Sequence, residues 1–338
     1  MRVLGVTFSV IISRAPLRIS LFGGGSDLPS YSNLQPGAVL SFSINKYVYI
    51  VLHPNFLGQI QLKYSKSELV NEPSQIAHPI FRETLLMLNM NQPLEIGSFA
   101  DVPATGTGLG ASSSFTVALI KAVSTFQGVL LSKEEIARIA CEIEIDKCND
   151  PIGMQDQWAS SMGGINRFVF DRHLVNVNQI NLEKGQLASF QNTMMLFYVG
   201  GERNAHKILA SQAEAIRTNL VAFKALSKMV EIVDIAEVAL RNSEYSVLGE
   251  LLNESWHIKK SLTPAISNAR IDEIYRIAMQ NGASGGKLLG AGGAGFMIFI
   301  VKEGMQGNLL DALKFLRHIP FQIEHKGAEI IFSESDSK

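Results

Sequence analysis

A glycine-rich loop followed by serines, in the segment TGTGLGASSSF at residues 105–115, has the residue types that bind phosphate. A loop of glycines at the start of a helix lets several backbone N–H groups point at one spot, and the first helical turn adds partial positive charge. The serine hydroxyls can cap the helix, bond to phosphate oxygens or bind Mg²⁺, which prefers hard oxygen ligands. The alternative interpretation is a glycine-rich turn with a serine N-cap.

Two better-known nucleotide motifs do not fit the sequence. The P-loop pattern is approached only by GASGGKL, which has one residue too few between its glycines and a leucine at the hydroxyl position. Gly290, Gly292 and Gly295 satisfy G-x-G-x-x-G, but we expect a helical segment before them and the strand FMIFIV after them. A dinucleotide-binding loop needs a strand before and a helix after. We therefore expect no Walker-type loop and no nicotinamide cofactor.

The elements that must position the glycine loop can be predicted from the apolar pattern. The segment LEIGSFADV is predicted as a strand leading into the loop, and apolar residues recur at helical spacing from Phe115 to Phe126 after it. Ser132 and Glu135 form the capping box of the next helix, which brings Glu144 near its end. VTFSVII and AVLSFSINKYVYIVL are predicted strands, so the start of the chain should be mostly sheet.

The character of the chain changes near residue 188. TMMLFYV is predicted as a buried strand, and a mostly helical region follows from about 204 to 281, then FMIFIV and a final helix and strands. We expect two domains, 1–188 and 189–338, the second with helices packed on a small sheet. The predicted class is α+β.

Composition favours a small-molecule partner. The chain has 338 residues, 46% of them hydrophobic, which is enough for two domains with sizeable cores. Its 30 basic and 31 acidic residues give no overall field for nucleic acid or an anionic membrane, so neither is an expected partner. The apolar start VLGVTFSVII is too short to span a bilayer and lacks signal-peptide features. Two cysteines, Cys141 and Cys148, fit a reducing, cytoplasmic location.

Three stretches resemble, in order, the signature motifs of the galactokinase, homoserine, mevalonate and phosphomevalonate (GHMP) kinase superfamily. They are RAPLRISLFGGGSDLPSY, PATGTGLGASSSF and GGKLLGAGGAGF. The resemblance implies a two-domain GHMP kinase-like fold, with an N-terminal ribosomal-protein-S5-like α/β domain and a C-terminal ferredoxin-like α+β domain. The active site would lie in the cleft between them, with ATP and Mg²⁺ as cofactors. RISLFGGGSDLPSY, DPIGMQDQW and ESWHIKKSL look most similar to bacterial kinases of D-glycero-D-manno-heptose 7-phosphate, then to fucokinase-type enzymes.

The resemblance also implies which residues hold the nucleotide and the metal. Ser112 and Glu144 would bind Mg²⁺, with Ser113 and Glu142 as the respective second candidates. The residues that would wrap the nucleotide phosphates are Pro103, Gly106, Gly108, Leu109, Gly110, Ala111, Ser112, Ser113 and Ser114. Ala111 stands where the family's loop has the first of two serines, so one hydroxyl near the phosphates is missing.

On the acceptor side, Arg18 and Asp27 have the nine-residue separation of an arginine and an aspartate in sugar-1-kinases. The resemblance implies that Asp27, with Gly25 and Ser26, binds sugar hydroxyls, and that Arg18 stabilises the transferring phosphoryl group. Asp156 would orient the anomeric hydroxyl or take its proton. Taken singly, the aspartates are as well explained by turns and Arg18 by a surface salt bridge.

A phosphorylated acceptor would need a local basic cluster, because it brings nearly two negative charges. The predicted acceptor-binding residues are Arg203, Lys207, Lys259 and Lys260, together with the glycines Gly292 and Gly293 that would shape the cleft. Each basic residue alone is as well explained as a solvated surface charge.

The resemblance thus implies an ATP-dependent kinase that converts D-glycero-D-manno-heptose 7-phosphate to the 1,7-bisphosphate for nucleotide-activated heptose. Its partners would be ATP and the sugar phosphate, and a homodimer is left open. One alternative is a fucokinase-type sugar-1-kinase. Others are a sensor that binds sugar and ATP without turnover, which the joint presence of Arg18, Ser112, Glu144 and Asp156 disfavours, and a dehydrogenase, which the misplaced glycine fingerprint disfavours.

Overall fold

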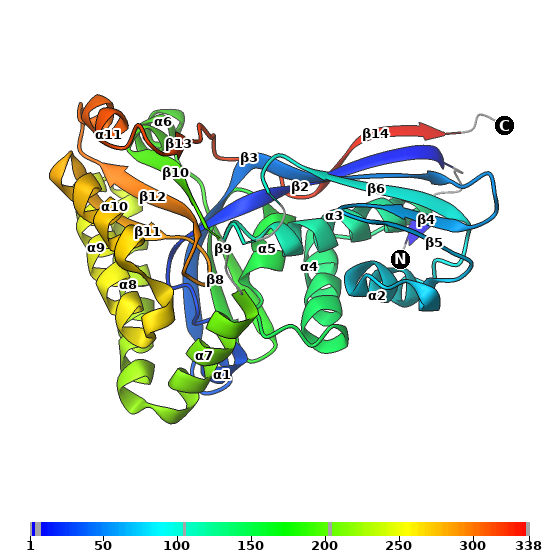
Figure 1. The fold of residues 1–338 in the computed structure, drawn as a ribbon, viewed down its shortest axis with the longest axis horizontal. Coiled ribbons are helices and arrows are strands. Elements are labelled where there is room, and N and C mark those ends of the chain that lie inside the picture. Colours follow the sequence, from blue (N-terminus) through cyan, green and yellow to red (C-terminus); the bar gives the residue numbers. More distant parts are fainter. Residues whose placement is uncertain (1, 4–7, 104–105, 202–204, 336–338) are drawn as a thin grey trace.

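The computed structural model describes residues 2–3, 8–103, 106–201 and 205–335. It confirms the α+β class, with a larger and a smaller sheet that each carry helices (Figure 1). Within the described part of the chain, none of the helices combines the length and the apolarity needed to cross a bilayer.

The larger sheet has eight strands, of which six follow the order β14-β2-β3-β6-β4-β5. Its strands are β2 (Phe8–Phe22), β3 (Gly37–Pro54), β4 (Ile60–Lys63), β5 (Ser67–Val70), β6 (Leu94–Ala100), β8 (Ile165–Asp171), β9 (Leu174–Ile180) and β14 (Glu329–Ser335). The first two residues of the strand predicted at VTFSVII lie outside the described ranges. From Phe8 the strand is confirmed as β2, and it runs on through RAPLRISLF, so Arg18 lies on it. The long β3 pairs with β8 along its first half and with β6 along its second.

One face of this sheet carries α2 and the helices that follow the glycine loop (Figure 1). They are α2 (Pro79–Met87), α3 (Ala111–Phe126), α4 (Lys133–Cys141), the π-helix η2 (Glu142–Lys147) and α5 (Gln155–Met162). The predicted capping box forms at the start of α4, where Ser132 and Glu135 bond to each other's backbone N–H groups. A core of aliphatic side chains, among them Ile50, Leu119 and Ile136, lies between these helices and the sheet.

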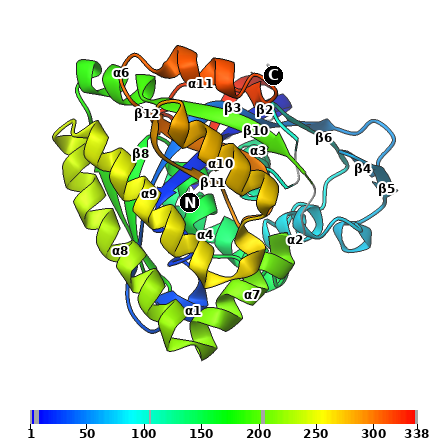
Figure 2. The ribbon, with the colours of Figure 1, turned by 60° about the vertical axis from the view of Figure 1, so that its left-hand side comes forward.

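The smaller sheet is antiparallel, in the order β11-β12-β10-β13. Its strands are β10 (Met194–Gly200), β11 (Ala283–Leu288), β12 (Gly295–Val301) and β13 (Arg317–His318). The helices of this part are α6 (Lys184–Asn192), α7 (Ala205–Thr218), α8 (Leu220–Arg241), α9 (Tyr245–Leu262), α10 (Ala269–Gln280) and α11 (Gln306–Ala312). Figure 2 shows α9 and α10 in front of β11, which both of them contact. The long helical region predicted before FMIFIV is confirmed.

The remaining elements are short. They are β1 (Arg2–Val3), which pairs with β7 (Val129–Leu130), the helix α1 (Pro29–Ser32), and the 3₁₀ turns η1 (Pro73–Gln75) and η3 (Pro264–Ile266).

Two features of the fold depart from the sequence expectation. A strand, β11, lies directly before the glycine motif at residues 290–295, where we expected a helical segment. The motif is the loop of a β-hairpin, and the exclusion of a dinucleotide-binding loop stands because β12, not a helix, follows it. The end of the chain also leaves the smaller sheet, since β14 pairs with β2 in the larger one.

The two sheets share one apolar core. Leu17 of β2, Leu196 of β10, Val233 of α8 and Ile298 of β12 belong to a single buried cluster. Contacts between segments far apart in sequence therefore fix the glycine loop relative to the helices of the smaller sheet. The site described next depends on this junction.

Candidate active site

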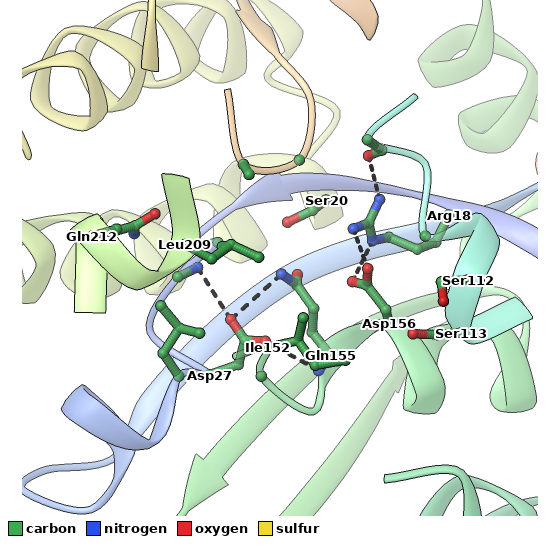
Figure 3. Close-up of a pocket in the computed structure, with 18 of the residues that line it drawn as sticks. Arg18, Ser20, Asp27, Ser112, Ser113, Ile152, Gln155, Asp156, Leu209 and Gln212 are labelled. Atoms are coloured by element: carbon green, nitrogen blue, oxygen red, sulfur yellow. Dashed lines mark hydrogen bonds and ion pairs between the residues drawn. The ribbon is translucent and has the colours of Figure 1, made fainter. Parts of the chain in front are cut away.

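A cavity of about 800 Å³ lies where the two parts of the fold meet (Figure 3). Its walls come from β2 and the turn after it, the glycine loop and α3, residues 150–156, α7, α9 and the β11–β12 hairpin. Most of the residues that the sequence singles out are thus brought to one cavity.

The glycine loop forms one side of this cavity. Gly106, Gly108 and Gly110 have φ angles of 74°, 78° and 74°, which residues with a side chain rarely adopt. Helix α3 begins at Ala111 with Gly110 as its N-cap and no side-chain cap, so the interpretation as a serine N-cap is wrong. The loop leaves the N-terminal N–H groups of α3 available to an anion.

The hairpin loop of the smaller sheet supports the glycine loop by close backbone approach. A Cβ atom on Gly295 would lie 2.4 Å from the carbonyl oxygen of Thr107 and 2.9 Å from that of Gly106. Only glycine fits here, as expected for the C-terminal glycines. Gly292 and Gly293 themselves do not line the cavity, whereas Gly290 and Ala291 do.

The three serines after the loop point in different directions. Ser112 is exposed and lines the cavity, and the buried Ser113 also reaches its wall. The hydroxyl of Ser114 instead donates to the carbonyl oxygens of Pro16 and Gly110, at 2.9 and 3.0 Å, and lies outside the cavity. Three predicted nucleotide contacts are therefore not at the cavity wall, namely Pro103, which is exposed, Leu109, which is a core residue, and Ser114.

Glu144, on the π-helix, is fully buried behind the serines. Its Oε1 accepts hydrogen bonds from the hydroxyls of Ser112 at 3.3 Å and Thr116 at 2.9 Å. Its Oε2 accepts from Ser113 at 2.7 Å and from the amide of Gln157. Burial raises the pKa of this carboxyl to about 7, although the hydrogen bonds act in the opposite direction.

The hydroxyl oxygen of Ser112 and the carboxylate oxygens of Glu144 fit the chemistry of Mg²⁺. In the described residues no group of three or more His, Cys, Asp or Glu side chains could hold a metal. Mg²⁺ needs no such cage, because it keeps several waters and binds through one or two protein oxygens plus substrate phosphates. Ser112 and Glu144 are the residues that would hold it, with the Ser112 hydroxyl at the cavity surface.

Replacing Ser112 by alanine is expected to raise the magnesium concentration needed for half-maximal activity by about tenfold, since one oxygen contact is lost. A magnesium titration at fixed ATP measures this. Ser114→Ala is the matched control, because its hydroxyl bonds to the backbone away from the cavity. A normal titration for Ser112→Ala would exclude Ser112 as a ligand.

The buried Arg18 and the half-buried Asp156 form a bidentate ion pair at the cavity wall. Arg18 Nε donates to Asp156 Oδ1 at 2.8 Å and Nη2 to Oδ2 at 2.6 Å, while Nη1 donates to the carbonyl of Gly108 at 2.6 Å. The Arg18 side chain is only 3% exposed, so the surface salt bridge considered as an alternative is wrong. The guanidinium connects the glycine loop to the aspartate, which places both at one point of the cavity wall.

Asp27 lies at the other end of the cavity (Figure 3). Its Oδ1 accepts from the backbone N–H of Gly25 at 3.1 Å and its Oδ2 from that of Gln155 at 3.2 Å. Burial raises the pKa of Asp27 to about 6, and the charge of Asp156 adds to the shift. Gly25 lines the cavity, but Ser26 does not, because its hydroxyl donates to the carbonyls of Gly23 and Ala38.

The predicted basic cluster is only partly at the cavity. Lys259 lines it and donates to the Gly290 carbonyl at 2.7 Å. Lys260, its neighbour on α9, pairs with Asp272 at 2.9 Å on the surface and is not a wall residue. Lys207 is exposed and also away from the wall, and Arg203 lies outside the described residues.

Sequence reasoning missed Lys287, which lies on β11 and is 2% exposed at the cavity wall. Its Nζ donates to the carbonyls of Ser20 and Leu21 at 2.9 and 3.0 Å. Burial, together with the charges of Lys259 and Arg18, lowers the pKa of Lys287 well below its usual range. No carboxylate of the described ranges is within ion-pair distance of it. The sequence feature that could have indicated this residue is a single lysine among the glycines and leucines of GGKLL.

Comparisons with known proteins agree with this geometry. The family model of the GHMP kinases N terminal domain matches residues 74–164, and that of the GHMP kinases C terminal domain matches residues 236–314. The D-glycero-alpha-D-manno-heptose 7-phosphate kinase of Campylobacter jejuni is 30% identical over 90% of this chain and 93% of its own. The bifunctional fucokinase/GDP-fucose pyrophosphorylase of Arabidopsis thaliana is 26% identical over 85% of this chain and 29% of its own.

A solved structure is also similar. The crystal structure of a D-glycero-D-manno-heptose 1-phosphate kinase from Bacteroides thetaiotaomicron has a TM-score of 0.79 and 26% identity, over 96% of this chain and 99% of that one. The fold and the site together define a small-molecule kinase. The chain belongs to the GHMP kinase family, with its N-terminal and C-terminal domains.

Proposed function

We propose that this kinase transfers the γ-phosphoryl group of ATP to O1 of D-glycero-D-manno-heptose 7-phosphate, giving the 1,7-bisphosphate. The observation that carries the proposal is the Arg18–Asp156 pair. It lies in the same cavity as Asp27, and Arg18 bonds to the glycine loop. A donor phosphate at the loop and an acceptor hydroxyl near Asp27 would meet at this pair. The identity of the sugar is supported by the Campylobacter jejuni relative.

The residues divide the work of phosphoryl transfer by position. The glycine loop and the N-terminus of α3 would hold the donor phosphates, and Asp27 would hold the acceptor. As the bond from O1 to phosphorus forms and the bond to the departing ADP oxygen breaks, Arg18 would stabilise the spreading negative charge. Asp156 would orient the O1 hydroxyl and receive its proton. Mg²⁺ held by Ser112 and Glu144 would neutralise charge on the nucleotide phosphates.

A phosphate on the acceptor is supported by the positive charge at the cavity. Arg18 and Lys259 line it, and Lys287 lies at the same wall, although burial and these two charges lower its pKa well below its usual range. We assign Arg18 to the transferring phosphoryl group and Lys259 to the acceptor phosphate. The product would serve the synthesis of nucleotide-activated heptose.

The test is an ATP-consumption screen of the purified protein across free and phosphorylated heptoses and hexoses. The proposal expects the highest kcat/KM with D-glycero-D-manno-heptose 7-phosphate. Preference for L-fucose would favour the fucokinase-type alternative, which the Arabidopsis thaliana relative supports. Binding of sugar and ATP without turnover would instead indicate a sensor.

The pH dependence should report Asp27. As the pH falls through about 6, the pKa of this carboxyl, Asp27 takes up a proton and accepts hydroxyl hydrogen bonds poorly. We expect kcat/KM for the acceptor to fall about tenfold per pH unit below that point.

The stability of the protein should change with pH in the opposite sense. Because folding raises this pKa, the contribution of Asp27 to the free energy of unfolding is present at low pH and is lost as the pH rises through about 6.

Asp27→Asn provides the control for this pH profile. The variant should have a higher KM for the acceptor at neutral pH. Its kcat/KM should not fall as the pH drops through about 6, because the titrating group is gone. If kcat/KM of Asp27→Asn still falls near pH 6 as in the wild-type protein, another group causes the pH dependence.

A further inference from the structure

Three buried polar atoms at the cavity wall have no hydrogen-bond partner among the described residues. They are Ser20 Oγ, Gln155 Oε1 and Gln212 Nε2. Ser20 is 4% exposed and Gln212 is 1% exposed. Buried polar groups in folded proteins are almost always paired, so unpaired atoms that lie at a cavity wall point to a partner bound in the cavity.

Two glycines bring these atoms to one turn. A Cβ on Gly24 would lie 2.9 Å from Ser20 Oγ and 3.9 Å from Gln155 Nε2, and a Cβ on Gly25 would lie 2.3 Å from Gln212 Nε2. Side chains from β2, α5 and α7 therefore gather over Gly24 and Gly25, and the N–H of Gly25 donates to Asp27. The absence of side chains at Gly24 and Gly25 allows this close approach.

The chemistry of the set is that of a hydroxyl-binding site. Gln155 Nε2 faces Asp27 Oδ1 at 3.4 Å, which fixes the orientation of this amide and leaves its Oε1 as an acceptor. Gln212 Nε2 is a donor, and the Ser20 hydroxyl can donate or accept. The set beside Asp27 therefore contains both donors and acceptors, as the binding of hydroxyl groups requires. An anion would be repelled by the Asp27 carboxylate at this end.

Apolar side chains complete this end of the cavity. Leu28, Ile152 and Leu209 line the same region, and Figure 3 shows Ile152 and Leu209 beside Gln155. A sugar ring presents C–H groups between its hydroxyls, and these can pack on such side chains. A polyol is therefore a better match than a second phosphate or a free carboxylate.

We propose that Ser20, Gln155 and Gln212 determine acceptor specificity by binding the ring hydroxyls of a sugar. The inference rests on the proposed function, and it adds that the neutral part of the acceptor is recognised by these side chains together with Asp27. Gln212 donates to a ring oxygen, Gln155 accepts from a hydroxyl, and Ser20 bonds to a hydroxyl beside them.

The first test uses Ser20→Ala and Gln212→Met with D-glycero-D-manno-heptose 7-phosphate as the acceptor. Each should raise the acceptor KM by about 10- to 100-fold, because a ligand hydroxyl loses its partner, while the KM for ATP stays the same. The Tm of the ligand-free variants should be unchanged or higher, because an unpaired buried group has been removed. A structural role would instead lower the Tm and impair use of both substrates, and that result would overturn the inference.

Thr84→Val is the matched control. Thr84 Oγ1 on α2 is also buried without a partner in the described structure, but it does not line the cavity. Its replacement should leave the acceptor KM as it is in the wild-type protein. A rise equal to that of Ser20→Ala would overturn the inference, because it would show that loss of any such hydroxyl has this effect.

The second test compares monodeoxy analogues of the same heptose phosphate, each lacking one ring hydroxyl. The wild-type protein should reject at least one analogue, and Ser20→Ala or Gln212→Met should lose that discrimination. If the wild-type protein phosphorylates the heptose phosphate but the variants keep its KM and its discrimination, this inference alone is overturned. If the wild-type protein phosphorylates no sugar, the proposed function is overturned and this inference with it.

Discussion

Replacing Asp156 by asparagine is expected to lower kcat by a factor of about 10²–10⁴, with nucleotide binding largely kept. Asparagine preserves the shape of the side chain but cannot take a proton and carries no charge. Asp156 accepts two hydrogen bonds from Arg18, and it lies beside the glycine loop, since a Cβ on Gly110 would be 3.3 Å from its Oδ2. Steady-state kinetics with the acceptor identified by the screen measures kcat. Titration of the variant with ATP measures nucleotide binding.

The same substitution also removes the charge that balances a buried guanidinium, so stability must be measured alongside activity. Arg18→Met and the double variant complete a cycle. Because the pair acts as one unit, the kcat of the double variant should be close to that of the less active single variant. Additive losses would mean that Arg18 and Asp156 act independently. An unchanged kcat in Asp156→Asn would remove this residue from the mechanism.

The glycine loop and the acidic residues could be predicted from the sequence because their signal is local. Glycine at positions 106, 108 and 110 indicates the positive φ angles that the structure has there. The strand before the loop and the helix after it follow from the apolar periodicity. Arg18 and Asp156, in contrast, are 138 residues apart, and only their resemblance to family motifs suggested that they meet. Their bidentate geometry and burial depend on the packing of α5 against β2.

Side-chain direction is the part that the sequence did not reveal. Successive residues on a helix point about 100° apart, which is why Ser112 faces the cavity while Ser114 bonds to Pro16. The same rule separates Lys259 from Lys260. A run of serines or lysines does not tell which member faces the site unless the phase of the helix is known.

Contacts between the two sheets were equally hidden. Lys287 donates to backbone carbonyls that precede it by more than 260 residues, and Gln212 lies over Gly25. No short motif carries such a pairing, because it depends on how the β11–β12 hairpin and α7 dock on β2 and its turn. The unpaired atoms of Ser20 and Gln212 could be recognised only after burial was known.

Replacement of Lys259 and Lys260, one at a time, separates a phosphosugar kinase from a plain sugar kinase. Lys259→Met should raise the KM for heptose 7-phosphate by about 10- to 100-fold, since hydrogen bonds to charged groups contribute about 1.5–3 kcal/mol. The KM for ATP and the turnover of unphosphorylated heptose should change little. Methionine keeps most of the length of the buried stem, which limits the loss of packing.

Lys260→Met is the control, because this lysine pairs with Asp272 at the surface and is outside the cavity wall. It should leave both acceptors unaffected, since exposed ion pairs contribute little. An equal loss with phosphorylated and unphosphorylated heptose in Lys259→Met would assign Lys259 to the transferring phosphoryl group instead. A wild-type protein that prefers the unphosphorylated sugar would contradict the acceptor-phosphate assignment outright, and the fucokinase-type alternative would then account better for Arg18, Asp27 and Asp156.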